Sequence, residues 1–211
     1  MAGTTRYNAA EWLLDRNVAT GGASRTALIC GTQRLTYAEV QQQVWRAQHA
    51  LRSLDVRTGE RVAMVVNDEP AFVAWFLGAL RSGVVPVPLS TMLTADDLAA
   101  IVEDAGAGVV VVSADYASHL PVIARTAPEL RAAVVLGEGA MAPDGPGLPV
   151  HPWGDFDLLD EAPVATTGAD SPACWLYSSG TTGLPKGVMH RHGSFEVVAR
   201  TYGASVLGIR P

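Results

Sequence analysis

Short apolar runs alternate with helix-length amphipathic segments in the chain up to residue 136. Four runs rich in valine or alanine lie at residues 61–66, 84–87, 109–112 and 133–136. Continuous apolar runs, which lack the polar alternation of a half-exposed strand, are typical of parallel strands buried on both faces of a sheet. Because helix-length segments separate the runs, the pattern predicts an α/β fold, a layered parallel sheet with right-handed crossovers.

Capping signals mark the starts of several intervening helices. Asn8, Thr36 and Thr94 are each followed three positions later by Glu or Asp, which satisfies free N–H groups of a first helical turn. After Thr36, apolar residues recur at spacings of three and four as far as Leu54, which predicts an amphipathic helix. The other elements predicted in this region are a strand pair at 27–30 and 33–35 and helices at 70–80, 94–104 and 116–126.

The character of the chain changes after residue 136. Residues 1–136 make up the α/β layered region, whereas 137–172 are a loop-rich connection, because eight glycines and prolines fall between 137 and 152. Residues 173–211 form the third part. The elements predicted beyond residue 136 are one helical turn at 155–160, a strand at 173–178, a Gly-, Ser- and Thr-rich loop near the chain end, a strand at 187–190 and a helix at 195–206 capped by Ser194.

Composition and charge narrow the class of protein. The 211 residues carry a net charge of −6, so the chain lacks the basic face that nucleic acid or an anionic membrane would require. The longest stretch without a charged residue, 171–185, is too short to span a membrane, and the N-terminus has no secretory signal. Cys30 and Cys174 match no metal spacing and are interpreted as buried free thiols. We expect a cytoplasmic protein without nucleic-acid or membrane partners.

The ten residues from Ser178 to Gly187 combine three residue types that bind phosphate. They read Ser-Ser-Gly-Thr-Thr-Gly-Leu-Pro-Lys-Gly. Glycines let backbone N–H groups converge on an anion, hydroxyls add donors and a lysine adds a compact positive charge. This combination predicts a loop that binds the phosphates of ATP. The predicted phosphate-binding residues are Ser178, Ser179, Gly180, Thr181, Thr182, Gly183 and Lys186, and Thr181, Thr182 and Lys186 are the strongest candidates.

Two other interpretations of this stretch fit less well. In a Walker-type loop, G-x-x-x-x-G-K-[ST], that begins at Gly180, a second glycine and a Ser or Thr would occupy positions where Pro185 and Gly187 stand. A P-loop kinase or GTPase is therefore disfavoured. A plain hairpin loop needs only one or two glycines and has no use for four hydroxyls and a lysine at fixed spacing.

The stretch resembles the signature loop of the adenylate-forming superfamily, which includes acyl-CoA and aryl-CoA ligases, firefly luciferase and adenylation domains of peptide synthetases. Residues 80–89 are similar to the superfamily's L-K-A-G-x-x-x-V-P-L segment, and 35–39 to its L-T-Y-x-E helix start. Within the superfamily, the chain is most similar to the benzoate-CoA ligase group. The segments that carry this finer likeness are 7–17, 27–30, 175–180 and 190–192. Thr181 stands where that group often has serine, which keeps the hydroxyl.

The resemblance implies an AMP-forming acid-thiol ligase. Such enzymes join a carboxylate to AMP from ATP with release of pyrophosphate, and the thiol of CoA then attacks the acyl-adenylate. The implied cofactors and co-substrates are ATP, Mg²⁺ and CoA, and the implied substrate is a small carboxylic acid, aromatic in the benzoate group. The loop would hold the β- and γ-phosphates with the help of Mg²⁺ and stabilise the charge on the departing pyrophosphate.

The resemblance also implies parts that this sequence does not contain. The superfamily's adenine-binding segment, ribose-binding aspartate, hinge and C-terminal lobe with the catalytic lysine all follow the loop, whereas only 24 residues follow Gly187 here. We therefore expect an N-terminal portion of the large domain that has no catalytic residue of its own. It would be inactive by itself and completed by the remainder of the same enzyme. The alternative is a standalone nucleotide-binding or assembly module.

Aromatic and imidazole side chains flank the predicted loop. His190 and His192 are candidates for lining a substrate pocket. Histidines at positions i and i+2 of a strand point to one face and could bind a metal ion, but no third ligand is evident, so no metal site is predicted. Trp175 and Tyr177, just before the loop, are expected to be core or interface residues.

Overall fold

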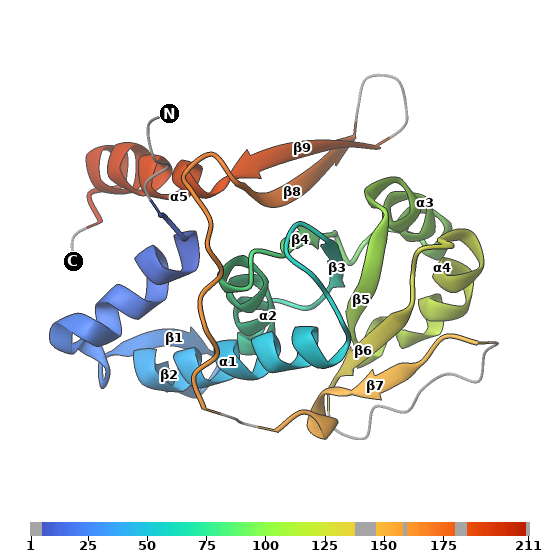
Figure 1. Cartoon of the computed structure of the whole chain (residues 1–211), viewed down its shortest axis with the longest axis horizontal. Helices are drawn as coiled ribbons and strands as arrows, with labels where there is room; N and C mark the ends of the chain where they lie inside the picture. Colours follow the sequence, from blue (N-terminus) through green and yellow to red (C-terminus); the bar gives the residue numbers. More distant parts are fainter. Residues whose placement is uncertain (1–5, 138–146, 158–159, 180–184, 210–211) are drawn as a thin grey trace.

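Five parallel strands form the central sheet of the structure (Figure 1). The computed structural model describes residues 6–137, 147–157, 160–179 and 185–209. The strands lie in the order β4-β3-β5-β6-β7, and each neighbouring pair is parallel. Their bounds are β3 Arg61–Val65, β4 Val85–Pro88, β5 Ala107–Ser113, β6 Ala132–Leu136 and β7 Val150–Pro152. The predicted α/β fold with a parallel sheet is confirmed.

The last strand of the sheet, β7, lies in a segment that the sequence predicted to be a loop. Val150 pairs with Ala133, so β7 extends the sheet beyond β6. Three residues that include a proline give no periodic signal, and the proline is tolerated because β7 lies at an edge. The helical turn expected at 155–160 instead occupies Trp153–Asp155 (η4), and residues 158–159 lie outside the described part of the chain.

Two helices cover each face of the sheet. α1 and α2 pack on one face, and α3 and α4 pack on the other (Figure 1). Val109 and Val111 of β5 belong to the core under α1 and α2, whereas Val110 and Val112 belong to the core under α3 and α4. This alternation explains why the strand sequences are apolar without interruption. The helix bounds are α1 Tyr37–Ser53, α2 Pro70–Arg81, α3 Ala95–Ala105 and α4 Leu120–Thr126, with a 3-10 segment η3 Ala114–His119 before α4.

Two of the three predicted helix starts have the expected capping geometry. Thr36 and Glu39 form a reciprocal capping box at the start of α1, and Thr94 and Asp97 form one at the start of α3. At Asn8 the side-chain oxygen accepts from the Ala10 N–H at 2.9 Å, whereas no return bond from Glu11 is present. The N-terminal helical segment that follows contains the wide turns η1 Glu11–Asp15 and η2 Val18–Gly22, and the predicted strand pair is observed as β1 Thr26–Cys30 and β2 Gln33–Thr36.

The last part of the chain forms an antiparallel hairpin and a helix above the sheet (Figure 1). Contrary to the prediction, Ser194 does not cap this helix, which begins at His192. The N–H groups of His192 and Gly193 donate to the carbonyls of Ser171 and Ala169 at 3.0 and 2.8 Å, so backbone acceptors satisfy the first turn instead. The bounds are β8 Pro172–Ser179, β9 Pro185–Arg191, α5 His192–Val198 and a wide-turn continuation η5 Ala199–Val206.

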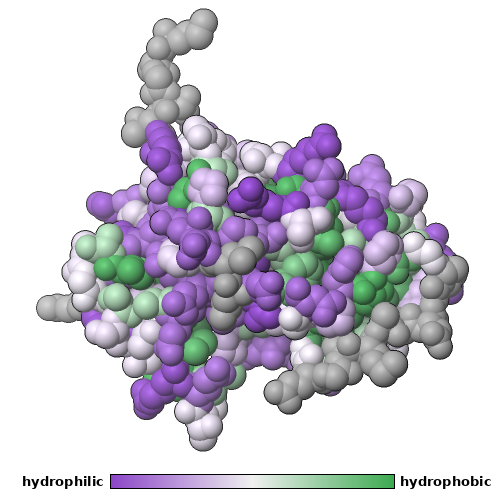
Figure 2. Space-filling view, turned by 60° about the horizontal axis from the view of Figure 1, so that its bottom comes forward, coloured by the Kyte–Doolittle hydropathy of each residue, from purple (hydrophilic) through white to green (hydrophobic). Residues whose placement is uncertain are grey.

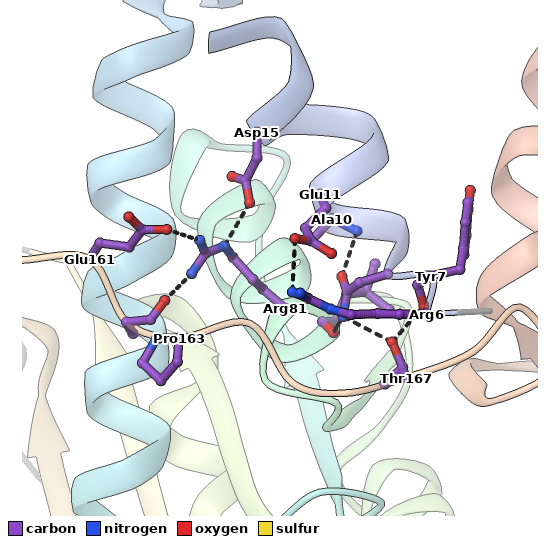
Figure 3. Close-up of polar contacts among 12 residues, drawn as sticks. Arg6, Tyr7, Ala10, Glu11, Asp15, Arg81, Glu161, Pro163 and Thr167 are labelled. Atoms are coloured by element: carbon purple, nitrogen blue, oxygen red, sulfur yellow. Dashed lines mark hydrogen bonds and ion pairs between the residues drawn. The ribbon is translucent and has the colours of Figure 1, made fainter. Parts of the chain in front are cut away.

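Arg81, the last residue of α2, joins three distant parts of the chain (Figure 3). Its side chain is 1% exposed. The guanidinium donates to Asp15 Oδ2 at 2.9 Å, to Gln48 Oε1 at 2.7 Å and to Glu161 Oε1 at 2.6 Å, and also to the carbonyl of Ala162. These partners lie in the N-terminal helix, in α1 and in the connection between β7 and β8. The planar fork of arginine donors can serve all of them at once, which makes burial of the charge tolerable.

Hydrophobic side chains are dispersed on one face of the sheet-bearing part, which comprises the described residues from 6 to 171 and so ends before the β8–β9 hairpin. Figure 2 shows the face at the bottom of Figure 1, where hydrophobic side chains occur in small groups separated by hydrophilic ones. Within the described ranges, no helix has the length and apolar character needed to cross a membrane.

Candidate functional site

The ends of the predicted phosphate loop are brought together by the β8–β9 hairpin. Ser178 pairs directly with Lys186 across the two strands, and Ser179 pairs with Pro185. Because directly paired residues of an antiparallel ladder point to the same face, the Ser178 hydroxyl and the Lys186 ammonium group lie on one side of the hairpin end. Both residues are exposed. The predicted residues Gly180, Thr181, Thr182 and Gly183 lie outside the described part of the chain.

Lys186 is the only lysine in the chain. The other fourteen of the fifteen Lys and Arg residues are arginines. Among the described residues, Lys186 has no ion-pair partner. Its ammonium group is therefore a solvated positive charge at the end of the hairpin, which suits an anionic ligand.

Tyr177 anchors the hairpin on its opposite face. Its hydroxyl donates to Asp104 Oδ2 of α3 at 2.5 Å. Burial and the neighbouring Asp104 carboxylate raise the pKa of Tyr177, so the hydroxyl stays protonated and can donate. The ring lies against Gly187, where an added Cβ would come within 3.1 Å of it. Gly187 is therefore needed for the close approach of the ring, in addition to any role in the loop.

A small hollow lies beside the loop end of the hairpin and the carboxyl end of β4. Its volume is about 230 Å³. Ligands of open α/β sheets bind outside the carboxyl ends of the strands, so this position fits the general rule. The lining residues are Pro88, Leu89, Ser90, Leu93, Ile101, Tyr177, Ser178 and Pro185.

The same rule points to the crevice between the carboxyl ends of β3 and β5, but hydrogen bonds close it. The chain leaves β3 for one face of the sheet and β5 for the other, which makes this the topological switch point. Ser113 Oγ accepts from the Asn67 N–H at 3.0 Å and donates to Glu69 Oε1 at 3.0 Å. Asn67 also donates to Asp115 at 2.8 Å and accepts from the Tyr116 hydroxyl at 2.9 Å. The hairpin end therefore has more donors free for a ligand than the switch point.

The two histidines after the loop occupy different environments, in contrast to the expectation that they share a strand face. His192 is the first residue of α5 and is fully buried. Its Nδ1 accepts from the Ala9 N–H at 3.0 Å, and burial lowers its pKa to about 4. It is thus a neutral residue that ties α5 to the N-terminal segment. His190 lies on β9, and among the described residues no three His, Cys, Asp or Glu side chains form a metal-binding group.

His190 lines an apolar hollow of about 310 Å³ between the hairpin, α2 and α5. The thiol of Cys174 lies in the same wall, and burial raises its pKa to about 11, so it is an inert thiol. Cys30, which the sequence predicted to be buried, is only half-buried on β1. The lining residues of the hollow are Phe76, Cys174, Leu176, His190, Ser194, Phe195, Val198 and Ala199.

Comparison with protein families identifies the class of the chain. Residues 14–209 match the family model described as AMP-binding enzyme. The chain belongs to this family, to which the fold and the Ser-, Thr- and Gly-rich sequence from Ser178 to Gly187 already pointed.

Aryl-CoA ligases are among its most similar relatives. The chain is 41% identical over 203 residues to a 4-hydroxybenzoate–CoA/benzoate–CoA ligase of Rhodopseudomonas palustris, with 95% of the chain and 36% of that relative covered. It is 36% identical over 206 residues to a benzoate–CoA ligase of Thauera aromatica, with 97% and 38% covered. The crystal structure of the anthranilate CoA ligase AuaEII with anthranoyl-AMP superposes with a TM-score of 0.86 at 30% identity, covering 97% of this chain and 38% of that one. The chain thus spans little more than a third of the length of these relatives.

Proposed function

We propose that this chain is the N-terminal portion of an ATP-dependent aryl- or acyl-CoA ligase. The enzyme would convert a carboxylate and ATP to an acyl-adenylate and pyrophosphate, and then transfer the acyl group to the thiol of CoA. The observation that carries the proposal is the pairing of Ser178 with Lys186 at the end of a hairpin, in a chain of the AMP-binding family. The named relatives act on benzoate and hydroxybenzoate, which supports an aromatic carboxylate as the substrate.

The hairpin end would bind the phosphate tail of ATP. A carboxylate is a poor electrophile because its leaving group would be oxide, and the mixed anhydride with AMP supplies a better one. As the carboxylate attacks the α-phosphate, negative charge grows on the departing pyrophosphate. Lys186, Ser178 and the predicted donors of the loop, including Thr181 and Thr182, would stabilise that charge together with the Mg²⁺ ion that accompanies ATP as substrate.

The unique lysine allows this proposal to be tested in the 211-residue chain itself. An amine-specific reagent can modify only Lys186 and the N-terminal amine, and the latter serves as an internal reference. Added ATP with Mg²⁺ should slow the modification of Lys186 but not that of the N-terminus, as followed by peptide mass spectrometry. AMP is the matched control, because it lacks the β- and γ-phosphates and should protect less.

The activity itself is tested in a longer gene product that contains this chain. We expect ATP–pyrophosphate exchange that depends on an aromatic carboxylate, and a fall of about a hundredfold or more on Lys186→Ala. The 211-residue chain alone should show no exchange. A longer product that neither exchanges nor protects Lys186 from modification would contradict the proposal.

A further inference from the structure

Exposed apolar side chains are concentrated in the last part of the chain. Among the residues that the structure describes, eleven large apolar side chains are exposed, and nine of them lie between Leu176 and Ile209. Scattered exposed apolar residues are normal on a protein surface, but a group confined to one short segment marks an interaction surface.

The hairpin shows which of its faces is left uncovered. Trp175 and Tyr177 point to the sheet-bearing part and pack against its core. Leu176 and Val188, which pair with each other across the strands, point the opposite way and are 42% and 49% exposed. On the Trp175 side, the sheet-bearing part covers β8 but not Met189 of β9, which is 69% exposed. A two-stranded hairpin with one open face is marginal by itself, so a covering element is expected on that face.

The helix beside the hairpin continues the same surface. Val198, Tyr202 and Val206 recur at intervals of four along α5 and η5, and each is more than half exposed. Leu176 and Val198 line opposite walls of the apolar hollow of about 310 Å³. The outer face, defined as Leu176, Val188, Val198, Tyr202 and Val206, therefore surrounds a cavity that large apolar side chains could fill.

We infer that the outer face is the surface on which the remaining part of the same ligase polypeptide packs. This inference rests on the proposed function. The size of the relatives supports this occupant, because the match takes up only 36–38% of each of them and the larger part of each lies outside it. That part supplies apolar side chains to the outer face and to the hollow, and so completes the hairpin that carries Ser178 and Lys186.

Two neighbouring residues of β9 provide a matched test. Val188 lies on the outer face, whereas Met189 pairs with Trp175 on the opposite face and is 69% exposed. Val188→Lys and Met189→Lys are compared in the 211-residue chain and in the longer gene product. In the longer product, Val188→Lys should lower the Tm by roughly 5 °C or more, because it buries a lysine in an apolar interface, whereas Met189→Lys should have little effect. In the 211-residue chain, neither variant should shift the Tm by more than about 2 °C.

Other occupants give different results. If the 211-residue chain is a dimer that Val188→Lys dissociates in light-scattering measurements, a second copy covers the outer face and the inference is wrong. It is also wrong if the two variants behave alike in the longer product. Pyrophosphate exchange is measured separately, so a longer product that is sensitive to Val188→Lys but inactive would overturn the proposed function and leave this packing intact.

Discussion

The central sheet and the β8–β9 hairpin are buried to very different degrees. Every residue of β5 and β6 is buried, because helices cover both faces of the sheet. The hairpin is covered only where Trp175 and Tyr177 of β8 meet the sheet-bearing part, and it leaves Leu176, Val188 and Met189 exposed. The candidate phosphate-binding residues lie on the less buried of the two. The difference indicates that the sheet provides most of the stability, whereas the proposed chemistry depends on an element that the sheet only partly supports.

A few polar contacts connect the hairpin region with the sheet-bearing part. Tyr177 bonds to Asp104 of α3, and His192 accepts from the backbone of Ala9. Within the sheet-bearing part, Arg81 has a comparable role but is far more buried and has more partners. Substitutions within the sheet-bearing part should therefore lower the free energy of unfolding more than substitutions at the contacts of the hairpin region.

The largest effect is expected at Arg81. Arg81→Ala leaves Asp15 and Gln48 without their buried partner, and it should lower the free energy of unfolding by about 3–5 kcal/mol, as measured by urea denaturation. Arg52 is exposed on α1, so Arg52→Ala is the matched control and should change stability by less than about 0.5 kcal/mol. Equal losses in the two variants would show that the Arg81 network does not stabilise the sheet-bearing part.

A pair of leucine truncations compares the two regions directly. Leu98 of α3 is fully buried, whereas Leu176 of β8 is 42% exposed. Leu98→Ala should lower the free energy of unfolding by about 3 kcal/mol, because it removes transfer energy and leaves a cavity. Leu176→Ala should lower it by less than about 1 kcal/mol in the 211-residue chain. If both variants lose the same amount, the hairpin is as well packed as the sheet and the contrast drawn here is wrong.

Local sequence signals were sufficient to predict most of the sheet-bearing part. Most of its strands are continuous apolar runs, and α1 and α3 start at capping boxes, so a few neighbouring residues are enough to predict these elements. Strand β7 was not predicted, because Val150, His151 and Pro152 have no pattern of their own and become a strand only by pairing with β6. The buried position of Arg81 was not predicted either, because its partners lie 33 to 81 residues away in sequence.

The candidate site was predicted in part. The two strands that flank the predicted loop were predicted from the sequence and are observed as β8 and β9. The phosphate-binding roles of Ser178, Lys186, Thr181 and Thr182 stay predictions. The cap at Ser194 was wrong because carbonyls of a distant segment satisfy the helix start. The different orientations of Trp175 and Leu176 could have been predicted from strand alternation, but which face is covered depends on tertiary packing.

A pH titration tests the contact between α5 and the N-terminal segment. Burial lowers the pKa of His192 to about 4, below its ordinary value of 6.5, so the unfolded chain binds a proton before the folded chain does. The stabilisation is complete above pH 6.5 and is lost as the pH falls toward 4. Between pH 7 and pH 5, protonation of His192 should lower the free energy of unfolding by about 2 kcal/mol. His192→Asn should remove this component from the pH dependence of urea denaturation, and an unchanged slope would contradict it.

A smaller effect than at Arg81, Leu98 or His192 is expected at the anchor between the hairpin and α3. Tyr177→Phe removes the hydroxyl that bonds to Asp104 but keeps the ring against Gly187. The free energy of unfolding should therefore fall by about 1 kcal/mol. Because the bond holds the hairpin and not the sheet, hydrogen exchange should accelerate in β8 and β9 while the amides of β5 keep their protection. Tyr202→Phe, at an exposed position of η5, is the control and should change neither the free energy of unfolding nor the hydrogen exchange of β8 and β9. Faster exchange in β5 as well would mean that the hairpin and the sheet unfold as one unit, and the two regions would then differ in burial but not in stability.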